Sequence, residues 1–147
     1  MKPNLGRAVL GGLAGTVALT ILMYVGAPMM GIGKMDIAAM LGSMLGGWGM
    51  GMLMHFINGT VLFPSIYALI LFSKLRGSPV TKGVTWGVTL WLVAGLMVMP
   101  MMGAGFFGTG HGGLTAAVAS LMGHTIYGAL LGVITGGSIQ RLQEAAA

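Results

Sequence analysis

Three histidines and fifteen methionines are the side chains in this 147-residue chain whose types and spacing best suggest chemistry. His55 and His124 each lie in a long apolar run, and each has a glycine four residues later, at Gly59 and Gly128. Ionisable residues inside apolar spans are rare and usually face the interior of a helix bundle. Small residues next to two inward imidazoles would leave room for a flat macrocycle. The pattern therefore suggests a b-type haem with His55 and His124 as axial ligands.

The methionines suggest a second kind of site. Apart from the initiator, they all fall in the half of the expected topology that also contains the histidines. Thioether and imidazole are ligands that suit Cu(I). Met40 and Met44 are one helical turn apart, as are Met50 and Met54, and Met54 precedes His55. These five residues predict a Cu(I) site or relay.

Both patterns also have simpler interpretations. A histidine inside a membrane span often only forms an interhelical hydrogen bond, to another histidine, a hydroxyl or a carbonyl, worth roughly 0.6–2 kcal/mol. Methionine is a flexible side chain that fills irregular gaps between helices. The third histidine, His111, falls in a glycine-rich segment and its role stays open.

Enzyme chemistry has little support in the sequence. The chain has no cysteine, which excludes disulfides, thiolate metal sites and covalent haem attachment. The two acidic residues, Asp36 and Glu144, fall on opposite sides of the expected topology, too far apart for an acid–base pair. The Gly-x-Gly spacings do not follow a strand, so they do not predict a phosphate site. We therefore expect a protein that is not an enzyme.

The elements that must position the histidines and methionines are membrane-spanning helices. The chain is 56% hydrophobic and 6% charged, with a mean hydropathy of +0.93, whereas soluble domains have about 25% charged residues. Lipid-exposed backbone must satisfy its own hydrogen bonds, so we expect an all-α polytopic fold in a single domain, residues 1–147. The four expected spans are residues 8–27, 47–72, 83–102 and 114–136.

Basic residues predict the orientation of these spans. The cations on one expected side are Lys2, Arg7, Lys74, Arg76, Lys82 and Arg141. The other side carries only Lys34, which Asp36 offsets. The positive-inside rule then places both termini in the cytoplasm, with the chain in the inner (cytoplasmic) membrane. Residues 34–45 have the spacing of a short amphipathic helix at the interface, and residues 103–113 are expected to form a turn.

Two blocks indicate an internal duplication. Residues 28–33 (PMMGIG) recur as residues 100–105 (PMMGAG), 72 positions later. Residues 55–59 (HFING) are echoed by residues 124–128 (HTIYG), 69 positions later. We interpret these echoes as two two-helix units, about 1–76 and 77–147, related by an axis along the membrane normal. The alternative is that a chain rich in glycine and methionine produces chance matches.

Glycines four residues apart predict close helix packing. Apolar burial does not drive helix association in lipid, so small residues that allow backbones to approach take over that role. The rows among the 28 glycines are Gly11 and Gly15, Gly47 and Gly51, Gly83 and Gly87, and Gly128, Gly132 and Gly136. The sequence does not assign a row to the chain's own helices or to a neighbouring protein.

Four strings carry a resemblance to a known family: APMMGIGKMDIAAMLGSMLG, LMHFINGTVLFPSIYAL, VMPMMGAGFFG and SLMGHTIYGALLGVITG. Together they resemble a family of small four-span prokaryotic membrane proteins, labelled only as a domain of unknown function or as YagU-like. The resemblance implies a membrane-embedded protein, with terminal oxidases and copper proteins as occasional genomic neighbours. It implies no catalytic residue.

These observations lead to one main expectation and two alternatives. We expect a non-catalytic accessory subunit or assembly factor of a larger membrane complex, such as a respiratory one, surrounded by lipid and packed against other membrane subunits or its own copies. The basic residues lie between apolar blocks, as topology signals do, so nucleic acid is not an expected partner. One alternative is a haem- or Cu(I)-binding membrane protein. The other is a small-molecule permease.

Overall fold

The computed structural model describes residues 3–33 and 35–137, whose regular secondary structure is entirely helical. Within them, four stretches are long and apolar enough to cross a membrane: Leu5–Met29, Trp48–Leu71, Pro79–Met101 and Gly113–Thr135. The expected all-α fold with four candidate transmembrane helices is confirmed. The expected limits differ from the observed ones by only a few residues.

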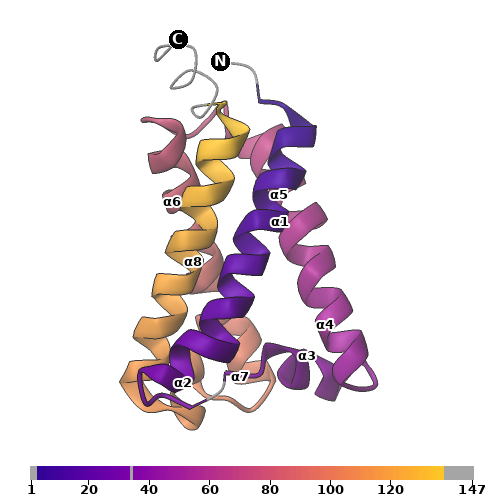
Figure 1. Cartoon of the computed structure of the whole chain (residues 1–147), viewed down its shortest axis with the longest axis vertical. Helices are drawn as coiled ribbons and strands as arrows, with labels where there is room; N and C mark the ends of the chain where they lie inside the picture. Colours follow the sequence, from indigo (N-terminus) through magenta and orange to yellow (C-terminus); the bar gives the residue numbers. More distant parts are fainter. Residues whose placement is uncertain (1–2, 34, 138–147) are drawn as a thin grey trace.

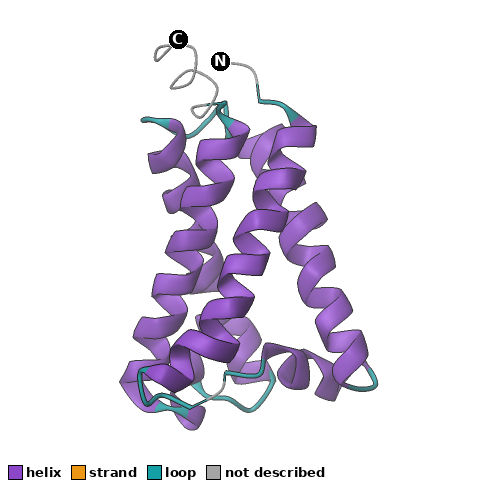
Figure 2. Ribbon diagram, viewed as in Figure 1, coloured by secondary structure: helices purple, strands orange, loops and turns teal. Residues whose placement is uncertain are grey.

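Most spans are built from several helical segments (Figures 1 and 2). The first contains α1 (Leu5–Ile21), the π-helix η1 (Leu22–Gly26) and α2 (Ala27–Met29), and a short helix, α3 (Ile37–Leu45), follows it. The second contains α4 (Trp48–Ile57), η2 (Asn58–Leu62), α5 (Phe63–Ile66) and η3 (Tyr67–Leu71). The third contains α6 (Pro79–Val93), η4 (Ala94–Val98) and α7 (Met99–Met101). The 3₁₀ segment η5 (Phe106–His111) then leads to the fourth span, α8 (Gly113–Thr135).

A wide π-helical turn precedes each proline inside a span. Segments η1, η2 and η4 each end two residues before a proline, at Pro28, Pro64 and Pro100. A proline ring clashes with the carbonyl four residues earlier. In each case that carbonyl lies inside the π-turn, where hydrogen bonds run five residues back, as from Ala27 N–H to the Leu22 carbonyl. The turns therefore accommodate the prolines, while α8 lacks proline and is a continuous α-helix.

Helix α8 packs against both α6 and α1, and glycines allow the close approach (Figure 1). A Cβ atom added at Gly83 would collide with the carbonyl oxygen of Gly128, and one at Gly128 would collide with that of Gly83. On the other side of α8, Gly11 and Gly15 of α1 face the backbone of Leu131 and Tyr127. These glycine rows therefore meet partners within the same chain.

Other glycines of the expected rows have different neighbours. Gly132 faces the Pro79 carbonyl, and Gly136 faces the Pro79 side chain. Gly51 faces the Ala38 carbonyl in α3. Gly47 differs from expectation, because no neighbouring atom lies within 4 Å of its Cβ position. It has a φ of 125°, which only glycine adopts readily, so its role is the turn before α4 rather than helix packing.

The two ends of the bundle differ in composition. Arg7, Lys74, Arg76 and Lys82 lie near the start of α1, in the η3–α6 connection and in the first turn of α6, and we call this the basic end. Segments α2, α3, α7 and η5 lie at the opposite end, the methionine end (Figure 1). Lys2, Lys34, Arg141 and Glu144, which also entered the orientation and acid–base arguments, lie outside the described residues.

The second and third spans are joined at the basic end. Tyr67 Oη donates to the Pro79 carbonyl at 3.4 Å, and Lys82 Nζ donates to the Phe72 carbonyl at 2.7 Å. One turn further in, the rings of Phe63 and Trp86 meet edge to face with centroids 6.5 Å apart. Toward the methionine end α4 leans away from the other spans (Figure 1).

Asp36 holds α3 in place at the methionine end. Its Oδ1 caps α3 by accepting from Ala39 N–H at 2.9 Å. The same oxygen accepts from Tyr24 Oη of the first span and from Trp48 Nε1 of the second, the latter at 3.1 Å. The short helix expected over residues 34–45 is therefore present as α3, and it packs against α4 through Ala38 and Gly42.

The two PMMGxG blocks have the same backbone conformation. Gly31 and Gly103 both have a φ of 74°, and the hydrogen bonds from Ile32 to Ala27 and from Ala104 to Met99 are both 3.0 Å long. The even-numbered spans are less alike, since the second contains two π-turns and α8 contains none. The duplication therefore stays a prediction, with its best structural parallel in the odd-numbered spans.

We predict that Gly128→Ala destabilises the bundle by about 1–3 kcal/mol, because the new methyl group forces two backbones apart. The measurement is unfolding in detergent by added sodium dodecyl sulfate, followed by tryptophan fluorescence. Gly49→Ala is the matched control, since nothing lies within 4 Å of its Cβ position. An equal loss of stability in the two variants would contradict the proposed α6–α8 contact.

Candidate functional site

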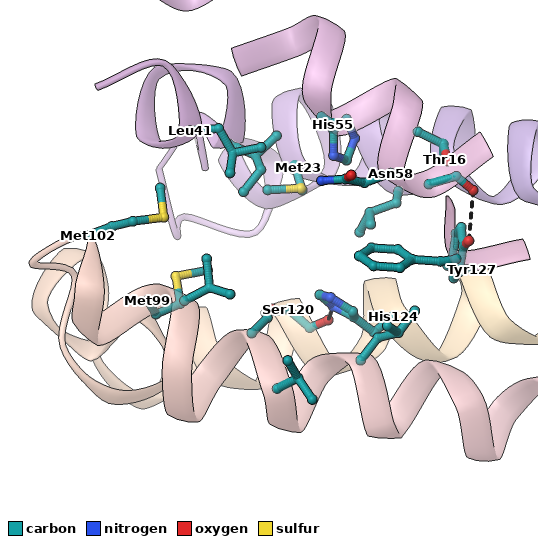
Figure 3. A pocket seen from close by; sticks show the side chains of 18 residues that line it. Thr16, Met23, Leu41, His55, Asn58, Met99, Met102, Ser120, His124 and Tyr127 are labelled. Atoms are coloured by element: carbon teal, nitrogen blue, oxygen red, sulfur yellow. Dashed lines mark hydrogen bonds between the residues drawn. The ribbon is translucent and has the colours of Figure 1, made fainter. Parts of the chain in front are cut away.

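A cavity of about 190 Å³ lies among the four spans, in the part of the bundle nearer to the methionine end (Figure 3). Its lining is mostly apolar and includes both intramembrane histidines. The lining residues are Thr16, Leu19, Met23, Ile37, Leu41, His55, Asn58, Gly59, Phe63, Leu90, Val93, Ala94, Val98, Met99, Met102, Ser120, His124 and Tyr127. The prediction that both histidines face the bundle interior therefore agrees with their positions.

The hydrogen bond of His124 determines which of its ring nitrogens carries the hydrogen and which keeps a lone pair. Nδ1 lies 2.8 Å from the carbonyl oxygen of Ser120, one turn earlier in α8. A carbonyl oxygen only accepts, so in the neutral ring Nδ1 carries the hydrogen and donates it. The lone pair is then on Nε2, the nitrogen further from the helix backbone.

The same reasoning assigns the hydrogen of His55. The Thr20 hydroxyl donates to the Thr16 carbonyl at 2.7 Å, and its oxygen lies 3.0 Å from His55 Nε2. A hydroxyl has one hydrogen, so here the Thr20 oxygen accepts and His55 Nε2–H donates. The lone pair of His55 is therefore on Nδ1.

Each imidazole thus uses its hydrogen to bond to a helix and keeps one lone pair. His55 and His124 lie on opposite walls of the cavity (Figure 3). Neither of these two hydrogen bonds joins the rings to each other, so the interhelical bond expected as the simpler interpretation is the one from His55 to Thr20. Two imidazoles that keep a lone pair suit a ligand that accepts electron pairs, above all a metal ion.

The methionines at this cavity are not the ones that the sequence pattern selected. Met23, Met99 and Met102 line it, and Met23 and Met99 are buried. Figure 3 shows Met99 and Met102 together at the methionine end of the cavity. The cavity therefore contains three thioether groups in addition to the two imidazole rings.

The five predicted Cu(I) ligands are dispersed. Of these, His55 alone lines the cavity. Met44 and Met50 are 58% and 47% exposed, and Met54 is half-buried without lining it. Met40 lines a second cavity at the methionine end. The position of Met23 in the lining could have been predicted, because Met23 follows Thr16 and Leu19 at helical spacing. The position of Met99 could not, because it follows a π-turn that the sequence did not reveal.

The space expected for a macrocycle is occupied at two of its glycines. A Cβ at Gly59 would meet the Thr16 side chain of α1, and one at Gly128 would meet the backbone of α6. Neighbouring helices therefore fill the flat slot on which the haem argument depended. Haem b stays a hypothesis, supported by two imidazoles that face one cavity. The side chain of His111, the last residue of η5, lies outside the described part of the structure.

The floor and the mouth of the cavity lie on different sides. On the side of the histidines that faces the basic end, Tyr127 Oη donates to the Gly59 carbonyl at 2.7 Å. This hydrogen bond joins α8 to the second span and closes the cavity on that side. Val93 and Val98 of the third span line the cavity and are also exposed. The cavity therefore reaches the side of the bundle beside these two residues of the third span.

Acidic and thiol ligands are absent from this arrangement. Among the described residues, no group of three or more histidine, cysteine or acidic side chains is placed to share a metal ion. A metal ion in this cavity would depend on the two imidazoles and on neutral thioethers. Such a ligand set favours soft ions over Mg²⁺, Ca²⁺ or Mn²⁺, which prefer oxygen.

Comparison with known families agrees with the resemblance seen in the sequence. A model described as a family of unknown function (DUF6789) matches residues 3–145. The chain belongs to this family. The match covers all four spans and both cavity histidines, and the expected membership in an uncharacterised family is confirmed. No curated protein and no solved structure matches the chain.

We predict that the two histidines have opposite neutral tautomers, with hydrogen on Nδ1 of His124 and on Nε2 of His55. Proton–nitrogen correlation spectra of ¹⁵N-histidine-labelled protein in micelles, recorded where both rings are neutral, distinguish the two forms. Thr20→Val removes the acceptor of His55 and should shift only the His55 signals. Hydrogen on Nε2 of His124 would contradict the assignment.

Proposed function

We propose that this protein holds a Cu(I) ion between His55 and His124 and acts as a copper-handling accessory protein in the membrane. The observation that carries the proposal is the direction of the two histidine hydrogen bonds. Each bond fixes a ring to a helix and leaves a lone pair, in a cavity that also contains three thioethers. Imidazole and thioether together are a ligand set for Cu(I).

The charge balance of the cavity supports a monovalent ion. Its lining contains no Asp, Glu, Lys or Arg, so with both histidines in the neutral form all of its ligands are uncharged. The cost of moving an ion from water into an apolar medium rises with the square of its charge. A divalent ion without a carboxylate to balance it would therefore be much less stable here than Cu(I).

The broader role as an accessory subunit or assembly factor of a larger complex, such as a respiratory one, is compatible with this proposal. A protein that holds Cu(I) must receive the ion from one partner and deliver it to another. Haem b is the second candidate, favoured by the two facing imidazoles. No contact in the cavity specifically favours a permease.

We also propose that the basic end faces the cytoplasm and the methionine end faces the outside of the inner membrane. Arg7, Lys74, Arg76 and Lys82 all lie at the basic end. Cytoplasmic loops of membrane proteins carry such an excess of lysine and arginine. The cavity would then lie nearer to the outer leaflet.

We predict that the purified protein binds one Cu(I) under anaerobic, reducing conditions, and that His124→Asn and His55→Gln each weaken binding about tenfold or more. Asn retains a donor for the Ser120 carbonyl and Gln retains one for Thr20, so each variant removes the free lone pair while keeping the helix contact. The affinity is measured by competition with a coloured Cu(I) chelator.

A matched pair of methionines serves as the control. Met99, 7% exposed, lines the cavity, while Met97, two residues earlier in the same span, is 59% exposed. Met99→Leu should weaken Cu(I) binding and Met97→Leu should not. Equal affinity in wild type, His124→Asn and Met99→Leu would refute the copper proposal. A Soret band in protein from native membranes would instead support haem.

A further inference from the structure

A second cavity, of about 390 Å³, lies at the methionine end beside α3. It is separate from the histidine cavity, but Met99 and Met102 line both. Its wall toward α3 contains Met35, Met40 and Ser43. Four thioethers therefore surround this second space, and two of them also border the first.

Asp36 brings negative charge to the second cavity. It is one of the lining residues, and its Oδ1 is fixed by Tyr24, Trp48 and the backbone of Ala39. A carboxylate in the lining makes a cation a more favourable occupant than an anion. The second cavity thus combines a carboxylate with soft sulfur ligands, whereas the lining of the first combines soft ligands with no acidic residue.

The lining residues of the two cavities offer a series of potential ligands that leads from the methionine end to the histidines. Met35 and Met40 belong to the second cavity alone, while Met23, His55 and His124 belong to the first alone. An ion that moves from one cavity to the other stays beside the shared sulfurs of Met99 and Met102. It also moves from thioethers alone to a set that includes imidazole nitrogens.

We propose that the second cavity is an entry site through which Cu(I) reaches the histidine cavity from the methionine end. The inference rests on the proposed function, because it assigns a route to the same ion. Each step forms one bond from copper to a thioether sulfur, or in the last step to the lone pair of an imidazole nitrogen, as one copper–sulfur bond breaks. Copper stays in the +1 state, and no proton moves because thioethers carry none.

An entry site affects rates and leaves the end point unchanged. Removing Met35 and Met40 raises the barrier for loading and for release by the same amount, since both directions cross it. The equilibrium affinity of the histidine cavity is then unaffected. This signature separates an entry site from a further part of the binding site.

The experiment compares two double variants in nanodiscs. Cu(I) is supplied as its complex with a water-soluble bicinchoninate chelator, and loss of the chelator's colour is followed by stopped flow. Met35→Leu with Met40→Leu should slow both loading and release about tenfold and leave the affinity unchanged. Met44→Leu with Met50→Leu is the control, with the same loss of two sulfurs at exposed positions, and both rates should match wild type. Leucine conserves volume, so the fold should tolerate both changes.

Every other outcome overturns the inference in a distinguishable way. If the wild-type protein binds no Cu(I), the proposed function fails and the route fails with it. If Met35→Leu with Met40→Leu leaves both rates unchanged, the proposed function stands and the entry site is refuted. If that variant lowers the affinity as well, these methionines are ligands of the final site. If the control pair slows loading equally, exposed sulfur in general collects the ion.

Discussion

Direct backbone contact between α6 and α8 is the constraint on which the rest of the structure depends. At Gly83 and Gly128 the carbonyl oxygen of each helix occupies the space that a Cβ of the other would need. Lipid is itself apolar, so apolar side chains gain little by leaving it for the interior of the bundle. Close contact between two backbones stabilises the helix pair through dispersion energy instead. Because α8 also receives Gly11 and Gly15 of α1, two sides of this helix are used by backbone contacts.

This arrangement explains why a cavity exists at the histidines. Helix α8 is in contact with α6 and α1, and α1 in turn meets the second span where Gly12 faces Gly59 and Pro64. The second and third spans are joined chiefly through side chains near the basic end. Toward the methionine end α4 leans away from the other spans (Figure 1), and the cavity lined by His55 and His124 lies in the space that is left. Their hydrogen bonds to Thr20 and Ser120 then set the orientation of both rings.

Much of this could be predicted from the sequence, for physical reasons that differ between features. Long apolar runs set the spans, because a bilayer tolerates little else. The spacing of Gly83, Gly87, Gly128 and Gly132 predicted close helix contact, because four residues nearly complete a turn. The inward position of the histidines followed from the cost of exposing them to lipid.

The set of methionines at the cavity could not be predicted in the same way. A π-turn contains more residues than an α-turn, so it rotates everything after it around the helix axis. Met99 lies directly after η4, and its direction depends on that rotation. The turn at Gly47 likewise depends on how α3 meets α4, which is a tertiary contact rather than a local preference.

The bonds that join the second and third spans near the basic end have a consequence for the surrounding lipid. The two spans are arms held at one end, and the opening of the cavity beside Val93 and Val98 lies away from that end. Acyl chains press laterally on any such opening, and the pressure varies with bilayer thickness and lipid shape. Membrane composition should therefore tune how widely the arms stand apart, and so how exposed the two imidazoles are to the hydrocarbon.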